Sequence, residues 1–289
     1  MMDFDVVAFQ LLNGLVWGLL LALIALGLCL IYGLMHISNL AHGSLFMLGA
    51  VLTAYACNTL GLPFWGAALI APLVVAALML LLDRVLFTHV LGREIAVSIL
   101  ATAGLLLVID NLVLAFFGGE PASVDAPLDG AVELFGITYP SYRLAAAGLA
   151  ILVLLAVGLF LRFTKYGLFM RAVPQARALA AATGVPIARV NALTIALGGL
   201  TAGLAGALAT PITGAHFQMG LAILAPSFIV VVVGGLGNLG GTVAVAIIYG
   251  LLRGLLSVAM TPTAAEATTL LCLLPVLYFR PRGLFGGGA

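Results

Sequence analysis

The stretch that decides the fold is QLLNGLVWGLLLALIALGLCLI, residues 10–31, which holds no acidic or basic residue. A helix needs about 20 mostly apolar residues to cross the hydrocarbon core of a bilayer, and it satisfies its backbone hydrogen bonds internally. This stretch therefore predicts a membrane-spanning helix. Further apolar segments follow it at residues 40–57, 64–82, 95–117, 143–161, 190–211, 222–236, 241–260 and 264–279.

The composition of the whole chain also indicates a membrane protein. Of its 289 residues, 64% are hydrophobic and 7% are charged, whereas soluble domains carry roughly 25% charged residues. Such a chain cannot coat a soluble globule with charge, which excludes a cytosolic enzyme, a secreted domain and a disordered chain. The net charge of +1 argues against a nucleic-acid binder. The three cysteines form no CxxC pair and no disulfide framework.

We therefore expect an all-α polytopic membrane protein in a bacterial-type inner membrane, with residues 1–289 as a single transmembrane domain. About eight transmembrane helices are expected, because residues 222–241 end in the glycine-rich run Gly234–Gly241 and are treated as a broken or re-entrant element. The segment 40–57 is also short and begins with polar residues. If that segment were re-entrant instead, the N-terminus would lie inside.

The distribution of charge predicts the orientation. Arginine and lysine cluster in residues 83–94, in residues 162–189 and in the C-terminal tail with Arg280 and Arg282, so these stretches are expected on the cytoplasmic side. The stretch 118–142 carries four acidic residues and no basic residue, and it is expected outside. The N-terminus is then outside as well. Residues 198–206 carry four glycines at spacings typical of a helix-packing face.

A few polar residues lie inside or beside apolar segments. Asn39 and His42 open the segment 40–57, where they either line a translocation path or form a turn at a helix start. Asn238 is a further candidate for the path. Asp110 and Arg253 are the most deeply placed charges, and we predict that they form a buried ion pair. The alternative is that each of them meets water or backbone separately.

Residues 235–240 match the pattern GxGxxG, but a dinucleotide site needs a strand before the pattern and an acidic residue about 20 positions after it. The next acidic residue, Glu266, lies beyond another apolar segment, so close helix packing explains these glycines better. The chain has no GxxxxGK[ST] phosphate loop. The four histidines form no metal-binding pattern. We therefore expect no cofactor, no metal and no catalytic residue.

The stretch 162–189 is basic and contains an alanine-rich segment, Gln175 to Thr183, that predicts a short helix. Gly184 follows as a helix C-cap and Pro186 as a helix stop. A short helix held between two membrane spans can dock on a soluble partner. The alternative is a solvated basic loop that only follows the positive-inside bias.

Together, several stretches resemble the LivH-type permease subunits of branched-chain amino acid ABC importers. They occur in the order of that family and cover nearly the whole chain. They are Asn13–Gly33, Asn39–Gly43, Met47–Ala50, Arg171–Val185, Arg189–Thr194, Val233–Asn238 and the tail from Arg280 to Gly286.

The resemblance implies that the chain pairs with a LivM-like second permease and two LivG/LivF-like ATPases. An external binding protein would deliver the amino acid. Residues 162–189 would then be a cytoplasmic coupling loop, and the residues that the resemblance implies for contact with an ATPase are Arg171, Ala172, Gln175, Arg177, Ala178 and Gly184.

This chain departs from the family at three places. Ala178 stands where the family commonly has a glutamate, and Arg253 stands where relatives carry an acid. Pro174 replaces a better helix former, which fits a helix start near it.

Alternative functions remain at this point. A membrane enzyme would need convergent acid–base or metal groups, and an ion-coupled secondary transporter would need intramembrane acids, of which Asp110 is the one candidate. Importers of the same class for urea, amides or aromatic acids also fit the sequence.

Overall fold

The computed structural model describes residues 4–134, 136–280 and 283–285. Arg282, Pro281 and Gly286, which belong to the expected basic tail, lie outside the described residues. The helices and strands are α1 (Phe4–Met35), α2 (His42–Asn58), α3 (Phe64–Leu82), the π-helical turn η1 (Asp83–Phe87), α4 (Thr88–Val90), α5 (Ile95–Phe117), β1 (Ala131–Leu134), β2 (Ile137–Pro140), α6 (Ser141–Phe163), α7 (Lys165–Ala172), α8 (Arg177–Ala182), α9 (Ile187–Thr213), α10 (Met219–Gly234), α11 (Leu239–Leu256) and α12 (Pro262–Phe279).

The helices confirm an all-α membrane protein. In the described part of the chain, seven helices are long and apolar enough to cross a membrane, namely α1, α3 with its continuation to Val90, α5, α6, α9, α11 and α12. The apolar helices α2 and α10 are shorter, with 17 and 16 residues. The expected number of about eight helices lies between these seven and the nine that include α2 and α10.

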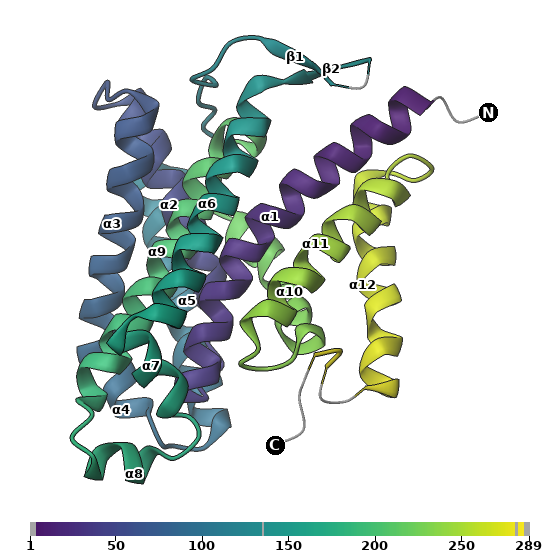
Figure 1. The fold of residues 1–289 in the computed structure, drawn as a ribbon. Coiled ribbons are helices and arrows are strands. Elements are labelled where there is room, and N and C mark those ends of the chain that lie inside the picture. The colour runs from purple at the N-terminus through teal and green to yellow at the C-terminus, as the bar shows by residue number, and fades with distance from the viewer. Residues whose placement is uncertain (1–3, 135, 281–282, 286–289) are drawn as a thin grey trace.

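The loops are sorted onto two faces of the bundle. Helices α7, α8 and α4 lie at one end together with the C-terminal end of α12, and the β1–β2 hairpin lies at the other end with the N-terminal end of α1 (Figure 1). Because the first end carries the basic stretches, we name it the inner face, and we name the other the outer face. Four helices, α9 to α12, follow α8, and an even number of passes brings the end of α12 back to the inner face. Eight full crossings from an outer N-terminus would instead end outside, so the expected number of helices did not agree with the expected cytoplasmic tail.

The breaks in the membrane helices differ from the expected one. The glycine-rich run does not interrupt a helix: α10 ends at Gly234 and α11 begins at Leu239, so residues 235–238 form a turn between two antiparallel helices. Non-helical backbone instead precedes α2 at residues 36–41 and α10 at residues 214–218. The sequence indicated the first of these breaks by the polar start of the short segment 40–57, and it did not indicate the second.

Helices α2 and α10 both begin inside the bundle. The His42 ring lies 2.9 Å from the carbonyl oxygen of Ile24, which is 11 residues before the end of α1 and therefore about 16 Å from its inner end. A Cβ added to Gly220 at the start of α10 would meet the carbonyl carbon of Gly43 at 2.9 Å. The two short helices thus start side by side and run to opposite faces.

Close backbone contacts between glycines hold the helices together. Gly14 and Gly18 of α1 face Gly250 of α11, with the Cβ position of Gly18 3.2 Å from the Gly250 Cα. The glycines of α9 that were expected to pack do so: Gly198 faces α1, Gly199 and Gly203 face α3, and Gly206 faces α2. Small residues let the helix backbones approach, and van der Waals packing then replaces the hydrophobic driving force that is missing in lipid.

Candidate functional site

The polar residues at the start of α2 are completely buried. Asn39 and His42 are each 0% exposed. The Asn39 side-chain oxygen accepts a hydrogen bond from the Ala41 N–H (3.1 Å), which is the turn at a helix start that the sequence offered as one alternative. His42 Nε2 donates to the Ile24 carbonyl, since a carbonyl oxygen can only accept. His42 therefore anchors the start of α2 against α1, and Asn39 supports the turn before it, whereas the role of either residue in a path stays a prediction.

Helix α5 fixes the non-helical segment from the other side. Thr102 Oγ1 accepts from the Leu40 N–H (3.2 Å) and donates to the Ser38 carbonyl oxygen (3.0 Å). One turn into α2, Ser44 Oγ donates to Asp110 Oδ1 at 2.7 Å. These bonds supply partners for backbone that has no helical partner at this depth, which is required wherever a transmembrane segment is interrupted.

The predicted ion pair between Asp110 and Arg253 is wrong. Arg253 Nη2 lies 3.1 Å from Glu266 Oε2, and Asp110 is bonded to Ser44. Asp110 is on α5, which packs against α2, whereas Arg253 is on α11, which packs against α1, α10 and α12. Sequence reasoning missed Glu266, because the turn between α11 and α12 breaks the helical period that would have related it to Arg253.

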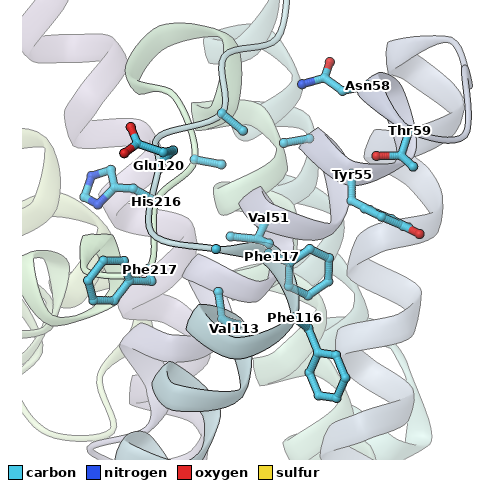
Figure 2. A pocket seen from close by; sticks show the side chains of 14 residues that line it. Val51, Tyr55, Asn58, Thr59, Val113, Phe116, Phe117, Glu120, His216 and Phe217 are labelled. Atoms are coloured by element: carbon cyan, nitrogen blue, oxygen red, sulfur yellow. The ribbon is translucent and has the colours of Figure 1, made fainter.

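A cavity of about 280 Å³ lies near the outer face between α2, the end of α5 and the two extended segments that carry Glu120 and His216. Figure 2 shows Glu120 and His216 at one side of it, Tyr55, Asn58 and Thr59 at the other, and Val113, Phe116 and Phe117 below. The two extended segments are joined by a pair of backbone hydrogen bonds between Ala122 and Ala215. This cavity is mostly apolar with a few polar groups, and nothing in the sequence pattern indicated it.

A second cavity, of about 430 Å³, lies at the inner face. Its walls are the inner half of α1, the turn between α10 and α11, single residues of α6 and α9, and four residues from the predicted coupling loop, namely Met170, Arg171, Pro174 and Gln175. The Arg171 side chain also donates to the Arg162 carbonyl oxygen at 3.4 Å. Part of the predicted coupling loop therefore lines this cavity at the inner face.

Residues 162–189, the predicted coupling loop, contain two helices, α7 and α8. The sequence predicts a helix over residues 175–183, and α8 covers 177–182. Gly184 has φ +83°, the left-handed conformation of a helix C-cap. Helix α7 was not expected from the sequence. Pro174 lies in the turn between α7 and α8, and α8 begins three residues after it, at Arg177.

Helix α8 has one buried and one exposed face. Ala180 is buried at 7% exposure, whereas Leu179 is 64% exposed. The predicted contact residues Gln175, Arg177, Ala178 and Gly184 are exposed as well, and Ala172 is half-buried. The exposed face of α8 thus carries Leu179 and Arg177 at the inner face.

The corner between α6 and α7 is rigid. Thr164 caps α7 by accepting from the Gly167 N–H at 3.0 Å. A Cβ at Gly167 would lie 2.5 Å from the Leu161 Cα and 2.5 Å from the Phe160 carbonyl oxygen, so glycine is required at this contact. The corner between α6 and α7 therefore depends on glycine at position 167.

Asn238 has two structural tasks at the inner face. Its side-chain oxygen accepts from the Gly241 N–H at 3.0 Å, which caps α11, and its side-chain NH₂ donates to the Phe285 carbonyl oxygen at 2.6 Å. Both polar groups of the side chain are used, so the structure assigns it a cap and a link to the tail. Its place in a path stays a prediction.

The two tasks of Asn238 can be separated. Asn238→Ala removes the cap and the link to the tail, and it should lower the free energy of unfolding by about 1 kcal/mol or more. Asn238→Asp keeps a capping oxygen and loses only the donor to Phe285, so it should retain most of the stability. Thermal unfolding of the purified chain in detergent measures both variants, and equal losses would contradict a capping role.

In the described residues, no group of three His, Cys, Asp or Glu side chains is placed to hold a metal ion.

Comparison with known proteins gives the family. The sequence model of the branched-chain amino acid transport system permease component matches residues 10–279. The high-affinity branched-chain amino acid transport system permease protein LivH of Escherichia coli K12 is 25% identical, over 96% of this chain and 94% of that protein. LivH of Salmonella typhimurium is 24% identical with the same shares. BraD of Pseudomonas aeruginosa, with the same description, is 24% identical over 96% of this chain and 95% of that protein.

Among solved structures, PsaBC from Streptococcus pneumoniae in complex with Fab aligns with a TM-score of 0.49 and 16% identity, covering 94% of this chain and 92% of that chain. The match of the family model spans nearly the whole bundle, from the second turn of α1 to the end of α12. The chain is a multi-pass integral protein of the bacterial-type inner membrane, and it belongs to the family of permease components of branched-chain amino acid transport systems.

Proposed function

We propose that this chain is a permease subunit of an ATP-driven importer that moves leucine, isoleucine and valine across the inner membrane. The observation that carries the proposal is the match of the family model to residues 10–279. The LivH and BraD relatives, matched over more than 90% of both chains, are described as permease proteins of high-affinity branched-chain amino acid transport.

The partners in this proposal are a second, LivM-like permease, two ATPases and an external binding protein. The chain has no phosphate loop of its own, so ATP hydrolysis belongs to separate subunits. The exposed face of α8 supports contact with such a subunit, because it presents Leu179 between basic residues at the inner face. The acidic stretch at the outer face is the side from which a binding protein would deliver its amino acid.

Coupling in this proposal runs from α8 to the membrane helices. Closure of the ATPases pushes on α8, which is joined to α6 through α7 and leads directly into α9. Helix α9 packs on α1, α2 and α3 through small residues. Small side chains interlock little, so helices can shift against one another without large steric cost, and the path opens alternately to each face.

Reconstitution tests this function. The chain is placed in liposomes with the second permease and the ATPases, and uptake of labelled leucine is measured with the binding protein outside and ATP inside. Uptake should require ATP and the binding protein, and it should be competed by isoleucine and valine. Uptake of leucine by this chain alone, driven by an ion gradient, would overturn the proposal. Competition by urea, amides or aromatic acids but not by valine would assign another substrate.

A further inference from the structure

An ion pair lies near the outer end of the α11–α12 hairpin. The guanidinium of Arg253, in the last turn of α11, is 3.1 Å from the carboxylate of Glu266 on α12, and the two side chains are 23% and 32% exposed. A charge inside a membrane domain is costly and generally faces protein or a water-filled cavity. Because both side chains are partly exposed, they border cavities rather than being enclosed by protein.

Arg253 has a second partner on a different helix. Its guanidinium carbon lies 5.2 Å from the centre of the Trp17 ring, over the face of the indole. Trp17 belongs to α1, so the guanidinium is held between α1 and α12. Attraction between a cation and an indole ring is strongest where water is excluded.

Arg253 and Trp17 line two cavities. The outer one, of about 480 Å³, is lined by both residues together with Asn13 and a second arginine, Arg143. The deeper one, of about 180 Å³, is lined by both residues and Glu266, and its remaining walls are mostly apolar. Those walls include Phe46 near the start of α2, and Met219 and Ile223 at the start of α10.

We propose that Arg253, Glu266 and Trp17 form a binding site for a zwitterionic amino acid on its way through the permease. The substrate carboxylate replaces Glu266 as the partner of Arg253, and the substrate ammonium group binds Glu266. The branched apolar side chain enters the deeper cavity and contacts Met219 and Ile223. This site rests on the proposed function, since it names where the substrate of that importer binds.

Charge balance explains why an ion pair is suited to this task. A zwitterion brings one positive and one negative charge, so an exchange of partners leaves every charge paired and adds no net charge to the membrane domain. When the substrate leaves, Arg253 and Glu266 pair again. The ion pair competes with the substrate for both partners. Binding therefore stays weak enough for release, which transport requires.

The fluorescence of Trp17 can report binding at this site. The chain has two tryptophans, and the other one, Trp65, is 42% exposed at the start of α3. In a Trp65→Phe chain, Trp17 alone fluoresces, and it should respond when Arg253 moves toward a bound carboxylate. L-Leucine should give a saturable change. Leucinol, which lacks the carboxylate, and 4-methylpentanoate, which lacks the ammonium group, should give none at the same concentrations.

An apolar variant separates binding from a structural role. Arg253→Met with Glu266→Leu replaces the ion pair by apolar side chains of similar size, a change that proteins often tolerate well. The leucine response of Trp17 should be lost, and uptake by the assembled importer should fall about tenfold or more. Thermal unfolding and co-purification with the partner subunits should stay close to those of the unaltered chain.

The outcomes distinguish this proposal from the function on which it rests. If the unaltered importer takes up leucine and the apolar variant does so equally well, the site is wrong and the function stands. A leucine response of Trp17 without any uptake by the importer would retain the site and overturn the function. Absence of a saturable response to leucine, or equal responses to leucinol and 4-methylpentanoate, would overturn the site. If the apolar variant fails to assemble, Arg253→Lys tests the site instead. This variant keeps the positive charge and should retain part of the leucine response of Trp17, and an undiminished response would overturn the site.

Discussion

Gly206→Val should prevent the chain from accumulating as a folded protein. A Cβ at Gly206 would fall well inside contact distance of the Phe46 carbonyl oxygen and would lie 2.9 Å from the Ala50 amide nitrogen. Both atoms belong to the backbone of α2, so no rotation of a side chain relieves the overlap. Overpacking typically costs about 1–3 kcal/mol, and the cost here should exceed about 3 kcal/mol because α2 itself must move.

The matched control is Gly148→Val on α6, where an added Cβ meets no atom within 4 Å. That variant should be produced in normal amounts and should unfold at nearly the unaltered temperature. Yield of detergent-extracted monodisperse protein and its thermal unfolding measure both variants. Normal yield and stability of Gly206→Val would show that α2 and α9 do not pack as closely as the structure has them.

Leu179→Asp should abolish most of the ATP-driven uptake without unfolding the permease. Leu179 is 64% exposed on α8, and an apolar anchor at the centre of an interface contributes about 2 kcal/mol or more, which corresponds to roughly thirtyfold in affinity. An aspartate would have to be desolvated in the interface with the ATPase. Because residue 179 lies in the first turn of α8, an acidic side chain there does not disturb the helix itself.

Leu60→Asp provides the matched control. Leu60 is 59% exposed and lies between α2 and α3 at the outer face, opposite α8. Co-purification with the ATPases and uptake in liposomes are measured for both variants. Leu179→Asp should lose both, and Leu60→Asp should retain co-purification. If Leu179→Asp still co-purified and transported at the unaltered rate, α8 would not be the contact to the ATPase.

The elements that sequence could predict are those fixed by local physics. Each long apolar run became a helix, because a bilayer demands internal hydrogen bonding. Gly184 became a C-cap because a left-handed residue ends a helix there. The sorting of basic and acidic stretches onto opposite faces follows from charge alone. Such features need no knowledge of which helices are neighbours.

The features that were missed depend on neighbours distant in the sequence. Asp110 and Arg253 are both deep charges, yet each finds its partner on an adjacent helix, Ser44 and Glu266, that only the packing of the bundle selects. The break before α10 was not expected, and for the start of α2 the sequence offered a turn without its partner, because Thr102, which binds the Leu40 N–H, lies 62 residues away. The site of Arg253, Glu266 and Trp17 combines three helices, and its local sequence carries no signal for it.

The early start of α2 inside the bundle has a consequence for how the chain is made. Helix α2 as a whole packs against α9, α3 and α10, and Thr210 of α9 bonds to the Ala50 carbonyl across 160 residues. At a synthesis rate of about 5–20 residues per second, α2 waits roughly 10–30 s on the ribosome-bound chain before α9 and α10 exist. During that interval His42 can already bond to Ile24 of α1, whereas the face of α2 that meets α9 is uncovered. Variants that weaken the contact between α9 and α2 should therefore leave this face of α2 uncovered after synthesis as well.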